Sequence, residues 1–146
     1  MAPKQLYLIQ GMFFQEYNYI YGDCALKLMY DNLSDNAPVY ECLYAGILKM
    51  NFAGKGHHLG ALEDYFGKSD LNEIVFTDTK LEFVKKYYGR DDKIHYSFEK
   101  KDKEFWIGTW KHSIYNYNKG VTWCLLTPIE EKFFDLFKVK KQLCAV

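Results

Sequence analysis

The stretch Glu104-Phe105-Trp106-Ile107-Gly108-Thr109-Trp110-Lys111-His112 is the clearest strand signal in the chain. Side chains alternate between the two faces of an extended backbone, so Trp106, Gly108 and Trp110 share one face. A glycine between two bulky residues on a strand marks a bend, or a place where a neighbouring side chain or backbone comes close. We therefore predict a curved, aromatic-rich sheet. We also predict that Gly108 does not tolerate a larger side chain, because the two tryptophans leave no room on that face.

The same alternation recurs along the chain on both sides of this stretch. The other predicted strands span residues 6–19, 40–52, 57–67, 73–77, 81–88, 93–99 and 121–126. Turn-forming residues separate them at 67–70 and 89–92, and residues 31–38 form the clearest loop. Residues 25–30 also alternate, but Gly22 and Asp23 could cap a helix over 24–33, so both interpretations stay open.

Eight or nine short strands joined mostly by hairpin-length turns indicate an all-β protein. A single domain over residues 1–146 fits the length, and aromatic residues make up 18% of the chain, which favours strands. The meander is typical of a sandwich or of an antiparallel up-and-down β-barrel. We favour the barrel because closure removes exposed edge strands.

A short C-terminal helix is predicted over residues 128–138. Thr127 to Glu130 has the pattern of a capping box, with Pro128 at the first helical position. Ile129, Phe133 and Phe137 follow at helical spacing. We expect this helix to plug or flank one end of the barrel.

The order of these motifs resembles the calycin group, which includes lipocalins and fatty-acid-binding proteins. The resemblance spans residues 6–126 and rests on the order and spacing of several short motifs. These are Gly11-x-Phe13, Phe52-x-Gly54-x-Gly56 with His58 and Gly60, Leu81-x-Phe83-x-Lys85-x-Tyr87, Ile94-x-Tyr96, and Trp106-x-Gly108-x-Trp110. It implies a barrel and allows an interior ligand site, without naming a ligand.

The charge and the cysteine content limit the cellular compartment and the classes of partner that we expect. Nineteen basic and nineteen acidic residues give zero formal charge, so no overall field favours nucleic acid or an anionic membrane. No apolar run approaches the roughly eighteen residues of a membrane-spanning helix. The four cysteines, at positions 24, 42, 124 and 144, lack the spacing of a metal site or disulfide framework. We expect free thiols and a cytoplasmic protein.

No catalytic or metal-binding motif stands out. His57 and His58 are neighbours and would point to opposite strand faces, so they do not readily share one metal ion. Haem held by a single histidine is a minor possibility. Glu63 and Asp64 diverge in the same way, which favours a solvated face or a turn over a catalytic pair. We therefore expect neither an enzyme nor a resident metal or cofactor.

The faces assigned to the barrel interior predict a ligand-binding wall. Its members are Phe13, Tyr17, Met50, Phe83, Lys85, Tyr87, Tyr96 and Trp110. An apolar wall with a few polar groups is typical of small-molecule pockets. A buried Lys85 would require an acid, from the protein or from the ligand. The expected function is binding of an apolar or aromatic small molecule. The alternative is a protein-interaction module whose aromatic side chains fill the barrel.

Overall fold

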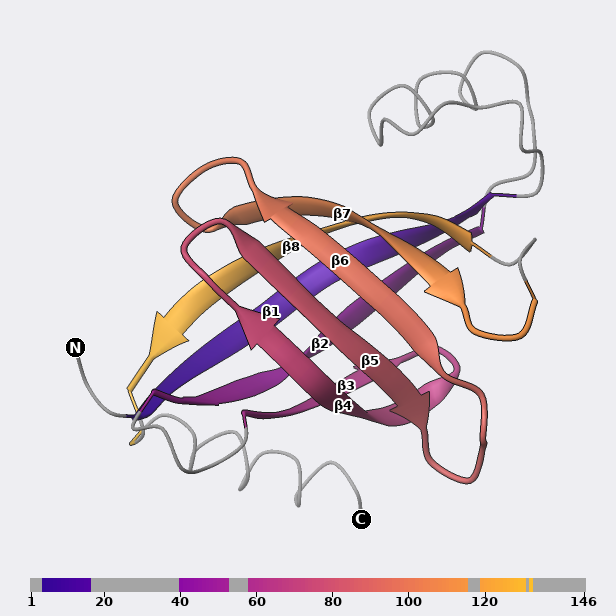
Figure 1. The fold of residues 1–146 in the computed structure, drawn as a ribbon, viewed down its shortest axis with the longest axis horizontal. Coiled ribbons are helices and arrows are strands. Elements are labelled where there is room, and N and C mark those ends of the chain that lie inside the picture. The colour runs from indigo at the N-terminus through magenta and orange to yellow at the C-terminus, as the bar shows by residue number, and fades with distance from the viewer. Residues whose placement is uncertain (1–3, 17–39, 53–57, 116–118, 131, 133–146) are drawn as a thin grey trace.

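A computed structural model describes residues 4–16, 40–52, 58–115, 119–130 and 132. Eight antiparallel strands close into a single barrel in chain order, from indigo β1 to yellow β8 (Figure 1). The strands are β1 (Lys4–Glu16), β2 (Tyr40–Asn51), β3 (Leu59–Asp64), β4 (Gly67–Phe76), β5 (Lys80–Tyr87), β6 (Ile94–Lys100), β7 (Phe105–His112) and β8 (Lys119–Ile129). The prediction of an all-β, antiparallel up-and-down barrel is confirmed.

Closure depends on the long first strand, which pairs with both β2 and β8. Gly11 lies opposite Tyr44 on one side and opposite Cys124 on the other. Because β1 completes the ladder in both directions, no strand of the barrel is left with an unpaired edge.

The β3–β4 connection differs from the sequence prediction. A strand over 57–67 and a turn over 67–70 were expected, whereas the turn is at Tyr65 and Phe66 and β4 already begins at Gly67. The Asp64 carboxylate accepts a hydrogen bond from the Phe66 amide at 2.8 Å, which closes the turn locally. Gly67 then adopts a φ of 126°, a conformation that L side chains rarely take.

Strand β4 also contains the barrel's clearest irregularity in the described chain. Its register against β5 shifts between Asn72 and Val75, and Glu73 between them has a φ of 51°. Such a bulge bends one strand relative to its partner and helps a sheet curve into a barrel.

The predicted end of the last strand was wrong. Strand β8 continues through Thr127 to Ile129, with Pro128 opposite Tyr7 and Ile129 opposite Leu6. The residues expected to start the helix are therefore in the sheet, because β1 is long enough to offer them partners. The remainder of the predicted helix lies, except for Glu130 and Lys132, outside the described residues.

Three other predicted segments lie wholly or partly outside the described residues. They are the end of the first strand at 17–19, the strand or helix over 24–33, and the loop over 31–38. His57, Cys24 and Cys144 also lie outside. Cys42 and Cys124 are free thiols buried in the barrel.

The barrel interior is packed with aromatic and aliphatic side chains. Seven of the eight predicted interior residues are buried, and Tyr17 lies outside the described residues. The buried ones are Phe13, Met50, Phe83, Lys85, Tyr87, Tyr96 and Trp110. The physical reason offered for Gly108 was wrong, since the atoms that a side chain there would meet first belong to the backbone of Ser97 and Phe98 in β6.

Candidate functional site

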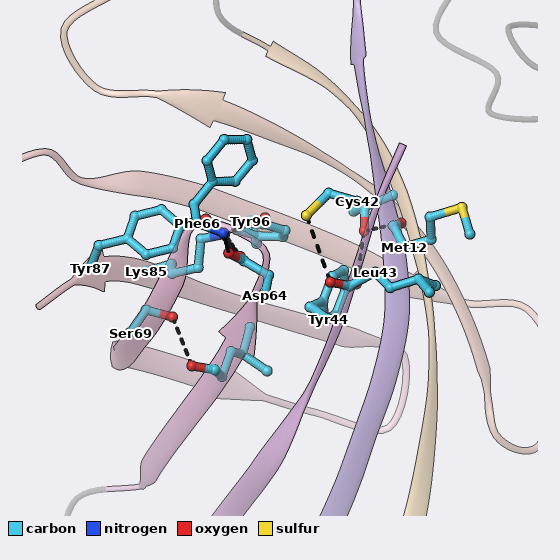
Figure 2. A network of polar contacts seen from close by, with 12 residues as sticks. Met12, Cys42, Leu43, Tyr44, Asp64, Phe66, Ser69, Lys85, Tyr87 and Tyr96 are labelled. Atoms are coloured by element: carbon cyan, nitrogen blue, oxygen red, sulfur yellow. Dashed lines mark hydrogen bonds and ion pairs between the residues drawn. The ribbon is translucent and has the colours of Figure 1, made fainter. Parts of the chain in front are cut away.

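A buried ion pair forms the centre of the candidate site. The Lys85 ammonium on β5 lies 3.1 Å from Oδ2 of Asp64, the last residue of β3. The side chains are 1% and 0% exposed, so water does not screen the pair. Figure 2 shows the two groups meeting beside Tyr87 and Tyr96, with Phe66 close by. An ion pair this deep is costly to desolvate and has to be held by further contacts.

The two charges come from strands that are not neighbours in the sheet. Strand β4 lies between β3 and β5, and Gly67 pairs with Asp64 while Ser69 pairs with Tyr87. Ser69 is buried and its hydroxyl donates to the Leu62 carbonyl at 3.3 Å. The ion pair between Asp64 and Lys85 therefore joins β3 to β5 across β4.

Hydrogen bonds use all three donors of the Lys85 ammonium. It donates to Asp64 Oδ2 at 3.1 Å, to Tyr87 Oη at 2.8 Å and to Tyr96 Oη at 3.0 Å. The Tyr87 hydroxyl donates in turn to Asp64 Oδ2 at 2.6 Å. The network is therefore tightly connected, as a buried polar group requires. We call Asp64, Lys85, Tyr87 and Tyr96 the lysine network.

Aromatic rings enclose the ammonium as well. Lys85 Nζ lies 4.8 Å from the ring centroid of Phe13, 4.5 Å from that of Tyr87 and 5.0 Å from that of Tyr96. Rings at these distances attract a cation through their negative faces, more strongly when water is excluded. They offset part of the cost of burying the charge.

Burial shifts the ionisation of the network. Burial lowers the pKa of the Lys85 ammonium, and the Asp64 carboxylate opposes that shift. Burial raises the pKa of Tyr87, and its hydrogen bond to Asp64 raises it further. Burial also raises the pKa of Tyr96 well above its ordinary value. Both tyrosines therefore present neutral hydroxyls at physiological pH.

The Asp64 carboxylate links this interior network to an exposed turn. Its Oδ1 accepts from the Phe66 amide while its Oδ2 binds Lys85. The Phe66 ring is 52% exposed and stacks on Phe13 with 6.4 Å between centroids. Its neighbour Tyr65 is 90% exposed. The turn thus places aromatic side chains between solvent and the lysine network.

A second polar cluster crosses the interior at Tyr44. The Tyr44 hydroxyl lies 2.8 Å from Thr122 Oγ1 and donates to the Trp123 carbonyl at 3.0 Å. Thr122 donates to the Met12 carbonyl at 2.9 Å. A side chain at Gly11 would collide with the Tyr44 ring and the Trp123 carbonyl, so the glycine makes room for this cluster. Its contacts tie β2, β8 and β1 together, which is a structural role.

The described histidines that make side-chain contacts serve the fold. His112 Nδ1 accepts from the amides of Ile114 and Tyr115, and its Nε2 lies 3.2 Å from Asp92 Oδ2. His58 Nδ1 accepts from the Asn51 amide. No cluster of three or more histidine, cysteine or acidic residues suited to a metal ion occurs among the described residues.

The structure brings most of the predicted interior wall together. Phe13, Tyr87 and Tyr96 all surround the Lys85 ammonium, as described above. The Phe83 ring stacks on Tyr96 at 5.1 Å, and Trp110 packs edge-on against Phe13 at 5.5 Å. Met50 is buried in the same core but lies near the C-terminal end of β2, where it pairs with Gln5 of β1.

Sequence reasoning missed Asp64 as a member of the site. Asp64 was assigned with Glu63 to a solvated face or a turn, and of the two only Glu63 is exposed. The signal that could have found it was the requirement for an acid beside a buried Lys85. The turn was predicted at 67–70, whereas β3 already ends at Asp64. The position of the carboxylate beside Lys85 depends on that strand end, so the sequence analysis did not find it.

Comparisons with protein-family models, with curated proteins and with solved structures found no match for this chain. The part of the chain that the structure describes contains no helix with the length and apolarity of a membrane span.

Proposed function

We propose that this chain is a calycin-like binding protein that holds a small apolar or aromatic molecule inside its barrel. The lysine network carries the proposal, because a charged pair and two tyrosines are kept in a ring-lined interior at a high desolvation cost. Perturbed ionisable groups in enclosed apolar surroundings are more frequent at functional sites than elsewhere. Such a site matches the usual chemistry of ligand pockets, an apolar wall with a few polar groups that fix orientation.

Binding is a better account of the network than catalysis. All three Lys85 donors are used within the protein, and both tyrosine hydroxyls are held neutral by burial. No described histidine accompanies them as a proton carrier. Tyr96, whose hydroxyl oxygen is bound by Lys85, would orient the guest, while Phe83, Tyr87 and Trp110 would contact its apolar body.

Native mass spectrometry of the protein purified from cells tests the proposal directly. A co-purified adduct would support binding and identify the guest by mass. Adding that molecule back to stripped protein should raise the melting temperature by mass action and change tryptophan fluorescence. Absence of an adduct, with no thermal shift across fatty acids, haem and aromatic metabolites, would contradict the proposal.

Two tryptophan variants separate a guest-contacting wall from a purely structural core. If Trp110 contacts the guest, Trp110→Ala should weaken binding by about 1–3 kcal/mol, in proportion to the apolar area lost. Trp123→Ala is the matched control, because Trp123 belongs to a separate cluster with Phe14 and Val121. It should leave affinity unchanged.

A second candidate function is a protein-interaction module with a side-chain-filled barrel. The observation that favours it is the continuous ring packing of Phe83, Tyr96 and Phe98, whose centroids lie 5.1 to 6.0 Å apart. In that case Trp110→Ala should chiefly destabilise the fold, by about 3–5 kcal/mol. Exposed aromatic residues such as Tyr65 and Phe66 would then serve as contacts for a protein partner.

A further inference from the structure

We infer that the guest is a neutral molecule whose polar end is a carbonyl or hydroxyl oxygen, and that the site discriminates against carboxylates. This inference rests on the binding function proposed above and names the chemical class of its ligand. It follows from the charge balance of the lysine network and from the one hydroxyl hydrogen that the network does not use.

The charge balance is already complete without a guest. Asp64 neutralises Lys85 at 3.1 Å, and both side chains are buried. A guest carboxylate beside Lys85 would bring a second negative charge to a single ammonium in a water-excluded space, which is strongly unfavourable. Arg90 approaches the Tyr87 ring at 5.4 Å, but it is exposed to solvent and its charge is screened there. A neutral guest avoids this penalty.

The hydrogen-bond count points to an acceptor on the guest. Lys85 uses its three donors, and the Tyr87 hydroxyl donates to Asp64. The Tyr96 oxygen accepts from Lys85, and its own hydrogen has no acceptor within the described part of the chain. Tyr96 is only 2% exposed. A buried hydroxyl normally donates as well as accepts, so a guest oxygen would complete the network.

The surroundings of Tyr96 suit an apolar body attached to that oxygen. Its ring contacts Phe83 at 5.1 Å and Phe98 at 6.0 Å. The cationic neighbour also strengthens Tyr96 as a donor, because Lys85 draws electron density from the phenolic oxygen it binds. Tyr96 is therefore the positioning donor, and the rings supply the apolar contact.

Matched pairs of probes test the inference. Acetylnaphthalene and naphthoate share a ring system, and methyl laurate and laurate share a chain, while only one member of each pair is charged near neutral pH. Affinities for the full-length protein come from calorimetry and tryptophan quenching. We expect the neutral member of the tighter-binding pair to bind at least about tenfold more tightly than the anion, a modest share of the cost of an uncompensated charge.

Two variants assign the preference to named groups. Tyr96→Phe should weaken the neutral probe by about tenfold, as expected for one buried hydrogen bond, and leave the weak anion unchanged. Asp64→Asn removes the internal counter-ion and should shift the preference towards the carboxylate by at least about tenfold. Tyr44→Phe is the control, since that hydroxyl has its own partners at Thr122 and Trp123. It should not change the ratio of the two affinities.

The outcomes distinguish this inference from the function on which it rests. If the carboxylate binds the parent protein as tightly as its neutral partner, binding stands and the neutral-guest inference is overturned. The inference is also overturned if Asp64→Asn, shown by its melting curve to be folded, leaves the ratio unchanged. If neither pair binds the parent, both the inference and the proposed binding function are contradicted.

Discussion

The indole Nε1 of Trp110 donates a hydrogen bond to the backbone carbonyl of Phe14 at 3.0 Å. Trp110 belongs to β7 and Phe14 to β1, so the bond reaches across the intervening strand β8. It does so at Gly120, which lies opposite Trp110 in the sheet. A side chain at Gly120 would collide with the Phe14 carbonyl and lie 2.8 Å from the indole nitrogen. The tryptophan and the glycine together fasten the barrel at its closing strands.

Gly120→Ala should therefore destabilise the fold, by roughly 1–3 kcal/mol or more as overpacking does. Chemical unfolding measures the loss. The control is Gly89→Ala, because Gly89 has open space around it and a φ of 77°, and only backbone strain of about 1 kcal/mol is expected there. Equal costs for the two variants would show that the collision at Gly120 is relieved by movement of the strands.

Removing one member of the buried ion pair should cost more than removing both. Lys85→Met leaves the Asp64 carboxylate in a dry interior, for which a loss of about 3–5 kcal/mol is expected. The double variant with Asp64→Asn has no buried charge and should recover much of that loss. Urea unfolding of the parent, single and double variants gives the comparison.

A surface pair serves as the reference for that experiment. Lys80 and Glu82 lie 3.4 Å apart with side chains that are 53% and 40% exposed. Lys80→Met should change stability by about 1 kcal/mol at most, as is usual for exposed pairs. If Lys85→Met lowered the unfolding free energy by as little as Lys80→Met does, solvent would have to reach the lysine network.

Tyr44 and Thr122 should be energetically coupled, because their hydroxyl oxygens lie 2.8 Å apart in one buried hydrogen-bond cluster. Tyr44→Phe removes the hydroxyl donor to the Trp123 carbonyl, and Thr122→Val removes the donor to the Met12 carbonyl, so each alone should cost about 1–3 kcal/mol. In the double variant the losses should not add, and a coupling energy of at least about 0.5 kcal/mol is expected. A double-mutant cycle by denaturant unfolding measures it, and strict additivity would contradict the contact.

Stability should fall as the solution becomes strongly alkaline. Burial raises the pKa of Tyr44 and Tyr96 well above their ordinary value of 10.0. Above pH 10, the unfolded chain therefore releases protons that the folded protein keeps, and each such group lowers the unfolding free energy by about 1.4 kcal/mol per pH unit. The pKa of Lys85 is lowered from 10.5, so below pH 10.5 this group makes the unfolding free energy rise with pH instead. The effect of this one group is smaller than the combined effect of the buried tyrosines.

Urea unfolding across the alkaline range checks this dependence. Tyr96→Phe should flatten the slope by about one proton, because it removes a buried phenol that keeps its proton in the folded state. An unfolding free energy that stays constant from pH 9 to 11 would contradict the assignment.

The strands and their faces could be predicted from the sequence more accurately than the connections between them. Alternation placed Phe83, Lys85 and Tyr87 on one face, because a period of two is a local property of extended backbone. The β3–β4 turn could not be located in the same way, since Gly67 was as plausible in a turn as at the start of a strand. That one uncertainty concealed Asp64, whose role depends on which residue ends β3.

The last strand shows the other limit of local reasoning. Thr127 and Pro128 have good local chemistry for a helix start, yet they pair with β1, more than a hundred positions earlier in the chain. Whether Thr127 and Pro128 join a helix or a strand depends on the length of β1, which is distant in the sequence. No local sequence pattern around Thr127 reports that length. The hydrogen bonds of the lysine network likewise depend on four strands, and they can be seen only once β3, β4, β5 and β6 are in register.

The pairing of β1 with β8 also has a consequence for how the chain folds. Every other neighbouring pair, from β1–β2 to β7–β8, joins strands that are consecutive in the chain and can form as soon as both strands exist. Closure of the barrel instead joins Leu6 to Ile129. Such a distant contact is formed at a high loop-closure cost, which slows folding. During synthesis, the chain exposes β1 and then β7 as open edges until β8 emerges, and that interval is when neighbouring nascent chains could pair with one another.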